Sequence, residues 1–308
     1  MNASELKQFI QARAKELGFD GVGIAKAERL DDAAVLLRSW LDTGQHGTMS
    51  YMDNHFEKRV NPTALVPGAK TVISFLYNYH QPNLNWTKGQ PKIASYAVGR
   101  DYHKVLKKKL KILFREIEEK VGTINGRIFT DSAPVMERQW AEKSGLGWRG
   151  KHTLLIHPKK GSWFFLAEII SDLDLKPDDP IEDHCGTCTR CIDACPTDAI
   201  SPQGYLMDGS KCISYLTIEK KDEIPKEFEG KMDDWAFGCD ICQDVCPWNR
   251  FAKAHNEPDF QPRADYSALS RKEWAEMTEE QFDEWFFGTP VKRAKYEGLK
   301  RNIDFLRK

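Results

Sequence analysis

The stretch CGTCTRCIDACP, Cys185–Pro196, decides how this chain is organised, together with a second stretch, CDICQDVCP, Cys239–Pro247. The first spaces its cysteines by x2, x2 and x3 and ends in Cys-Pro; the second has spacings of x2 and x3 and the same ending. Cys212 lies between them, so all eight cysteines fall within residues 185–246. Such dense spacing in a chain without secretion signals predicts metal ligation rather than a disulfide framework.

This spacing is typical of ferredoxin-like segments that hold two [4Fe–4S] clusters. Three thiolates on one tight loop bind three irons of a cubane cluster, and the fourth cysteine starts a helix that leads to the other cluster. Zinc is the alternative, because zinc ribbons share Cys-x2-Cys pairs, but the third cysteine at x2 and both Cys-Pro endings favour iron–sulfur. The expected ligand sets are Cys185, Cys188, Cys191 and Cys246 for one cluster and Cys195, Cys212, Cys239 and Cys242 for the other.

The overall composition indicates a folded protein with a sizeable core. The 308 residues include 45 basic and 46 acidic side chains, and 41% are apolar. Apolar runs such as Val72–Tyr77 are far too short to cross a bilayer, and the first residues show neither a signal peptide nor paired arginines. We therefore expect a cytoplasmic monomer that does not contact a membrane.

Helices and strands are expected to mix without strict βαβ alternation, which predicts the α+β class. Ser4 is expected to cap a first helix that Gly18 ends, Thr71–Tyr79 is the clearest strand, and Asp101–Lys120 is a long amphipathic helix. The other expected strands are Val22–Ala25, Arg127–Thr130, Thr153–His157 and Trp163–Ile169, and the other expected helices are Ala33–Leu41, Val135–Ser144, Arg271–Met277 and Glu279–Phe287.

An acidic stretch separates the first part of the chain from the cysteines. Asp172–Asp183 contains six acidic residues, one lysine and two prolines, which is typical of a solvated linker. Since a free-standing ferredoxin needs only the cysteine segment, the chemistry is assigned to the first part. The expected domains are residues 1–175, the catalytic domain; residues 176–250, the two-cluster domain; and residues 251–308, a helical tail.

Common cofactor motifs are incomplete in the first domain. Gly21-Val-Gly23 is too short for a dinucleotide loop. Asp53-x-His55 and Asp101-x-His103 begin like the cobalamin motif Asp-x-His-x2-Gly, but neither continues to the glycine. A histidine ligand to cobalt is therefore not expected.

Over nearly its whole length, the chain resembles the epoxyqueuosine reductase family. The resemblance is carried by both cysteine runs and by EKRV (57–60), LVPGAK (65–70), GRDYH (99–103), DSAPVMER (131–138), GLGWRGKHTLLI (145–156), GSWFFLAE (161–168) and GTPVKR (288–293). Members of this family reduce epoxyqueuosine to queuosine at the wobble base of certain tRNAs, using cobalamin and two [4Fe–4S] clusters. The resemblance implies a short form without the C-terminal helical-repeat domain that some members carry.

The resemblance also implies a nitroreductase-like domain that binds base-off cobalamin, with Asp131 as the proton donor. Opening an epoxide leaves charge on oxygen, which a nearby acid must neutralise, and desolvation beside an apolar macrocycle would raise the pKa of Asp131. A simpler interpretation makes Asp131 the N-cap of the helix that begins near Val135. The cobalamin contacts implied by the family are Arg59, Asp131, Leu155, Leu166, Ser214 and Asp240.

The implied partners are a tRNA anticodon stem-loop and an unidentified reductant. Residues 104–120 contain seven basic and three acidic residues, and residues 291–308 contain seven and two. Lys220 and Lys221, after a strand-like segment that follows Cys212, are further candidates for phosphate contact. Charged helix faces are also often merely solvated.

Three alternatives were weighed against this function. A reductive dehalogenase-like enzyme shares cobalamin and the cysteine pattern, but usually carries a twin-arginine signal. A ferredoxin-type electron carrier leaves the large first domain unexplained, and a cobalamin-processing chaperone has no need of eight matched cysteines.

Overall fold

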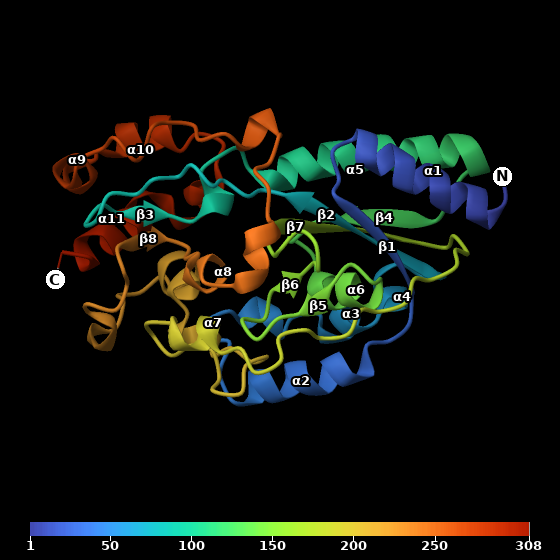
Figure 1. The fold of residues 1–308 in the computed structure, drawn as a ribbon, viewed down its shortest axis with the longest axis horizontal. Coiled ribbons are helices and arrows are strands. Elements are labelled where there is room, and N and C mark those ends of the chain that lie inside the picture. Colours follow the sequence, from blue (N-terminus) through green and yellow to red (C-terminus); the bar gives the residue numbers. More distant parts are fainter. Residues whose placement is uncertain (308) are drawn as a thin grey trace.

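A four-stranded antiparallel sheet forms the centre of the first domain in this computed structural model, which describes residues 1–307 (Figure 1). Its strands are rich in β-branched and aromatic residues, which suit a sheet that is covered on both faces. In spatial order they are β1 (Gly21–Lys26), β2 (Thr71–Asn78), β7 (Phe164–Ser171) and β4 (Gly126–Phe129).

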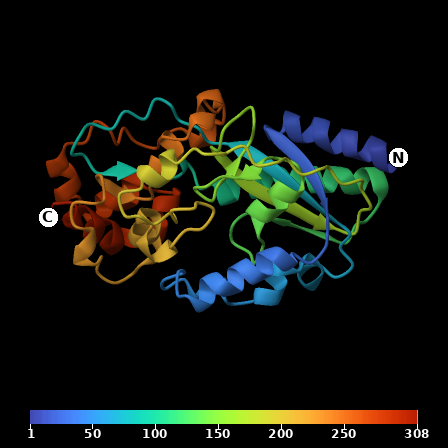
Figure 2. The ribbon, with the colours of Figure 1, turned by 60° about the horizontal axis from the view of Figure 1, so that its bottom comes forward.

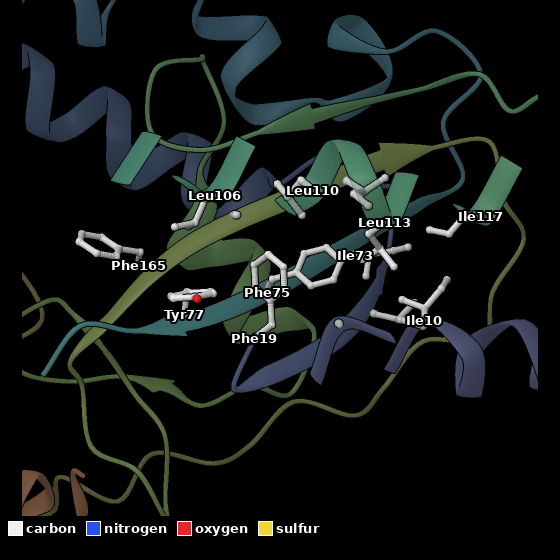
Figure 3. Close-up of a cluster of buried hydrophobic side chains, with 14 of the residues drawn as sticks. Ile10, Phe19, Ile73, Phe75, Tyr77, Leu106, Leu110, Leu113, Ile117 and Phe165 are labelled. Atoms are coloured by element: carbon white, nitrogen blue, oxygen red, sulfur yellow. The ribbon is translucent and has the colours of Figure 1, made fainter. Parts of the chain in front are cut away.

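Helices cover both faces of the sheet (Figures 1 and 2). On one face lie α1 (Ala3–Glu16) and α5 (Tyr102–Val121), and on the other lie α2 (Asp31–Asp42), α3 (Phe56–Val60), α4 (Pro62–Leu65) and α6 (Glu137–Lys143). Figure 3 shows the core under α5, where Leu106, Leu110, Leu113 and Ile117 recur at helical spacing. Burial of these side chains against the sheet is the main stabilisation of this half of the molecule.

Strand β7 divides its side chains between the two faces, because successive residues of a strand point in opposite directions. Phe165, Ala167 and Ile169 join the core under α1 and α5. The intervening Leu166, Glu168 and Ile170 face the side on which α6 packs. A buried glutamate in the centre of a sheet is unusual, and it lies beside the site described below.

The cysteine region consists of short elements around tight loops. It contains α7 (Arg190–Asp193) and α8 (Ile241–Asp244), which contact each other, and β8 (Trp235–Phe237), which pairs in parallel with β3 (Lys92–Ile93). The remaining hairpin, β5 (Trp148–Arg149) with β6 (Leu155–Ile156), lies beside α6.

The tail is helical, as expected, and builds a second core. Its helices are α9 (Arg271–Glu276), α10 (Glu279–Trp285) and α11 (Lys295–Phe305), and the last of these was not predicted. Residues 93–98, from the first predicted domain, pack in this core with the tail. The division of the chain at residues 175 and 250 stays a prediction. Residues 93–98 contact both of the later parts, because they pack with the tail and β3 pairs with β8 of the cysteine region.

The α+β class is confirmed, and local details differ from the predictions. Asn2, not Ser4, caps α1: its side chain accepts the N–H of Glu5, whose carboxylate accepts the N–H of Asn2. Cys246 precedes a 3-10 helix with Pro247 in its first turn, as expected, whereas Cys195 starts no helix. The segment after Cys212 is π-helical, Tyr215–Glu219, rather than strand-like. Among the described residues, no helix is long and apolar enough to cross a membrane.

We expect Gly23→Ala to destabilise the protein, because a Cβ at Gly23 would lie 2.2 Å from the carbonyl oxygen of Ser144, at the end of α6. Overpacking of this kind costs about 1–3 kcal/mol. Chemical denaturation measures the loss. Gly298→Ala in α11 is the control: its Cβ would meet no atom closer than 3.5 Å, so equal or higher stability is expected. A Gly23→Ala protein as stable as wild type would contradict this tight packing.

Candidate functional site

A cavity of about 1030 Å³ lies where the α6 side of the first domain meets the cysteine region and the tail. Its wall includes Leu37 of α2, Leu166 of β7, Cys212 of the cysteine region and Arg293 of the tail. Three parts of the chain that are distant in sequence therefore build one site. Asp131 lines the same cavity.

Asp131 follows strand β4 in the left-handed region, with φ of 55°. Its carboxylate accepts a hydrogen bond from the Tyr102 hydroxyl at 2.8 Å and lies 2.9 Å from Nε2 of His103. Its backbone N–H donates to the carboxylate of Glu137. The sequence places Tyr102 and His103 at the first turn of α5, so that helix and β4 together bring the acid and its partners into contact.

His103 lies between two carboxylates, with Nδ1 2.7 Å from Asp101 and Nε2 2.9 Å from Asp131. Burial alone would lower the pKa of His103, but the hydrogen bonds to Asp101 and Asp131 raise it to about 9. The imidazole is therefore protonated at neutral pH and uses both N–H groups as donors.

The pKa of Asp131 differs from the sequence expectation. Burial would raise it, but hydrogen bonds from His103 and Tyr102 hold the pKa of this carboxyl below its ordinary value. Without a macrocycle beside it, Asp131 is a carboxylate and the adjacent proton resides on His103. The N-cap interpretation is wrong, because α6 begins after Met136 and has no side-chain cap.

Four of the five other residues expected to contact cobalamin line the cavity: Arg59, Leu155, Leu166 and Ser214. Asp240 does not. Its buried carboxylate accepts hydrogen bonds from the N–H and the hydroxyl of Ser95, both at 2.7 Å, and so fixes the loop beside Cys239.

The wall suits a large ligand that carries both apolar surface and hydrogen-bond acceptors. Leu37, Met136 and Leu166 supply apolar surface. The buried Nε atoms of Arg59, Arg138 and Arg149, whose side chains line the cavity, have no hydrogen-bond partner among residues 1–307. Buried donors without a partner are costly, so these three guanidinium groups fit a ligand rich in amide or phosphate oxygens, as cobalamin is.

The eight cysteines gather into two adjacent groups. The thiol of Cys191 interacts electrostatically with Cys185, Cys188 and Cys246. The thiol of Cys242 interacts chiefly with Cys212, and also with Cys195 of the same predicted set and Cys191 of the other. The contact of α7 with α8 holds the two cysteine runs side by side, and the division of the cysteines into two ligand sets stays a prediction.

Basic residues approach the cavity from two directions. Arg293 lines it and forms an ion pair with Glu219 at 2.8 Å, and Lys107 of α5 donates to the Ser132 hydroxyl beside Asp131. Lys220 and Lys221 follow the π-helical segment but do not line the cavity. The Nζ of Lys220 lies 3.9 Å from a carboxylate oxygen of Asp222, and the Nζ of Lys221 donates a hydrogen bond to the backbone carbonyl of Ile218.

Sequence reasoning missed the partners of Asp131. The sequence presents His103 as part of an incomplete cobalt-ligand motif, and the adjacent Tyr102 and the N-cap Asp101 lie in the same GRDYH segment. Glu137 and Arg138 lie within the DSAPVMER segment, six and seven residues after Asp131. The closeness of Glu137 and Arg138 to Asp131 in the sequence is a signal that they belong to the same site. No comparable signal in the sequence indicates that the start of α5 packs beside the end of β4.

Comparisons with known proteins give the family. Residues 184–249 match the model of the 4Fe-4S double cluster binding domain, and residues 59–132 match that of epoxyqueuosine reductase QueG, DUF1730. The epoxyqueuosine reductase of Cellulophaga algicola is 56% identical over 308 residues, which cover 100% of both chains. That of Vibrio cholerae is 42% identical and covers 98% of this chain and 83% of its own.

Solved structures are similar over almost the whole chain. One is an epoxyqueuosine reductase with an epoxyqueuosine-modified stem loop of tRNA-Tyr; its TM-score is 0.90 at 30% identity, over 99% of this chain and 81% of that one. Another is the Bacillus subtilis epoxyqueuosine reductase with its catalytic aspartate loop swung out of the active site. Its TM-score is 0.88 at 30% identity, over 99% and 82% of the two chains.

NMR titration of the imidazole of His103 is expected to give a midpoint near 9, and Asp131→Asn should lower it toward the ordinary 6.5. Because the folded-state pKa is raised, the His103 interactions stabilise the fold fully below about pH 6.5 and this contribution is lost as pH rises through 9. His157, whose pKa burial lowers to about 4, is the internal control. A midpoint for His103 at or below 6.5 would contradict the assigned charge pair.

Proposed function

Because the chain belongs to the epoxyqueuosine reductase family, we propose that it reduces epoxyqueuosine to queuosine in the anticodon loop of tRNA. The carrying observation is that Asp131, with a protonated histidine behind it, lines a large cavity whose wall also contains Cys212 of the two-cluster region. The proposed acid (Asp131), the histidine that holds a proton for it (His103) and a cysteine of the proposed electron route (Cys212) therefore lie at one cavity.

The reaction consumes two electrons and two protons, removes the epoxide oxygen as water and leaves a carbon–carbon double bond. Cobalamin bound in the cavity supplies a strongly reduced cobalt centre for the electron transfer. Arg59, Leu155, Leu166 and Ser214 are the residues proposed to hold it, together with the unpartnered Nε groups of Arg138 and Arg149. The wall residues also exclude water from the reduced centre.

Asp131 and His103 manage the protons in this proposal. Asp131 delivers a proton to the epoxide oxygen as its C–O bond breaks, which prevents negative charge from building up on that oxygen. His103, at 2.9 Å, passes its own proton to the Asp131 carboxylate, which delivers it, and His103 then takes a proton from solvent that reaches the oxygen by the same route as the second of the two. Tyr102 orients the same carboxylate from the side. A ligand that covered this pair would remove water and shift the shared proton toward Asp131.

Two [4Fe–4S] clusters, when bound by the eight cysteines, would supply the route for electrons from a reductant. Cys185, Cys188, Cys191 and Cys246 are proposed for one cluster, and Cys195, Cys212, Cys239 and Cys242 for the other, in line with their grouping. Cys212 lines the cavity, so the cluster that its set would hold is proposed as the one nearer the reaction.

The tRNA anticodon is proposed to approach the open side of the cavity. Arg293 and Lys107 lie beside Asp131 and offer positive charge to its phosphates, with Lys220 and Lys221 as further contacts. A single-stranded loop allows one base to be turned into a pocket without breaking a duplex. A cytoplasmic location and a monomeric state stay predictions.

Asp131→Asn is expected to slow turnover by about 10²–10⁴-fold, because an amide cannot donate the required proton. The protein, reconstituted anaerobically with clusters, cobalamin and a chemical reductant, is incubated with an epoxyqueuosine-containing stem-loop, and mass spectrometry follows the loss of one oxygen. Asp42→Asn, at the exposed end of α2, is the control and should leave the rate unchanged. Unchanged turnover in Asp131→Asn would remove this residue from the acid role. A protein that never acquires corrin absorbance would contradict the proposed function.

Paired cysteine substitutions test the ligand sets. Wild type should bind about eight iron atoms as two [4Fe–4S] clusters. Cys188→Ser with Cys246→Ser, from one set, should leave about four, whereas Cys188→Ser with Cys212→Ser, from different sets, should leave almost none. Iron analysis and electron paramagnetic resonance measure the content, and the opposite order would overturn the assignment.

A further inference from the structure

Two carboxyl groups meet beneath Asp131, and the mechanism above does not use them. Glu168, in the middle of β7, is 0% exposed, and its side chain lies against that of Glu137 at the first turn of α6. No described residue donates a hydrogen bond to either carboxylate oxygen of Glu168. Two carboxyl groups in such contact cannot both be ionised without strong repulsion, so the pair must hold a proton.

The fold builds this contact from the sheet upward. Glu168 pairs in register with Ser74 of β2 and Phe129 of β4, so it is flanked by strands on both sides. Its side chain is on the α6 face, where α6 comes so close to the sheet that only a glycine fits at position 23. The packing of α6 against β7 brings Glu137, at the other end of the helix, to Glu168.

The groups around the pair supply no nearby cation that would neutralise both carboxylates. Asp131, Tyr102 and His103 face Glu137 electrostatically, and of these only His103 is cationic; it is already bonded to Asp101 and Asp131. Burial and the neighbouring Asp131 raise the pKa of Glu137, and burial and Glu137 raise that of Glu168 well above its ordinary value, so one proton is held between the two carboxyl groups. Both directions agree with the geometry.

We propose that Glu168 keeps a proton and donates it in a hydrogen bond to Glu137, whose carboxylate accepts the backbone N–H of Asp131, so that the pair positions the catalytic acid. Glu137 and Glu168 are thus positioning residues, and the proton between them is part of the device. This inference rests on the proposed function only in naming Asp131 as the acid.

The backbone at Asp131 explains why such a support is needed. A non-glycine residue in the left-handed region is strained by about 1 kcal/mol or more, and it stays there only when its surroundings hold it. The carboxylate of Glu137 supplies a charge-assisted hydrogen bond to that N–H. If the shared proton were lost, repulsion between Glu137 and Glu168 would pull this acceptor away, and the acid would leave its position against the cavity.

The first test needs no substrate or cofactor. Infrared difference spectroscopy of the unloaded protein at neutral pH should show the carbonyl band of one buried protonated carboxylic acid, which titrates at alkaline pH. Glu168→Gln should abolish this band, and Glu119→Gln, at the exposed end of α5, should leave it unchanged. Absence of the band in wild type, or its persistence in Glu168→Gln, would overturn the shared proton whether or not the enzyme reduces epoxyqueuosine.

The second test asks whether the proton matters for Asp131. A glutamine at position 168 can donate to Glu137 at every pH, so Glu168→Gln should keep kcat within about twofold at neutral pH and move the alkaline fall of kcat to higher pH. Glu168→Leu keeps the burial but removes the donor, and should lower kcat by about a hundredfold with KM nearly unchanged, as expected when a catalytic group is displaced by about 1 Å. A Glu168→Gln profile identical to wild type, with Glu168→Leu equally active and folded, would overturn the positioning role.

Discussion

The two-sided packing of strand β7 is the constraint on which the rest of the structure depends. Successive residues of β7 point to opposite faces of the sheet. One set packs in the apolar core beneath α5, and the other faces α6 and the cavity. The first set holds α5 in place, and with it Tyr102 and His103 at its N-terminal end. The second set includes Leu166 on the cavity wall and Glu168 beneath Glu137. One strand thus fixes both sides from which Asp131 is held.

The charges of the site follow from that arrangement. His103 is cationic because two carboxylates face its two ring nitrogens, and Asp131 is anionic because His103 and Tyr102 donate to it. Elsewhere on the cavity wall, the Nε atoms of Arg59, Arg138 and Arg149 have no hydrogen-bond acceptor among the described residues. The hydrogen bonds of Asp131 are complete, whereas the arginine Nε donors on the wall lack acceptors. This arrangement suits a ligand that contacts Asp131 and also supplies acceptors to the arginines.

The sequence predicted the cysteine groups and the principal elements because their signals are local. The spacing of the cysteines indicates two short ligand loops, and the periodicity of Leu106 to Ile117 is sufficient to predict α5. The partners of Asp131 could not be predicted in this way, because Tyr102 and His103 on α5 reach it only through the packing of that helix against the sheet. Asp240 shows the converse: it matched a family position but turns away from the cavity to bind Ser95.

The central claim is that Asp131 delivers a proton to the oxygen of the bound nucleoside. The distance that tests it is the one between the Asp131 carboxyl and the epoxide oxygen, in a crystal structure of the cobalamin-loaded protein with an epoxyqueuosine stem-loop. We predict that the two oxygens lie within hydrogen-bond reach, with His103 still bonded to Asp131. An epoxide oxygen that faces another residue, with Asp131 directed elsewhere, would contradict the account.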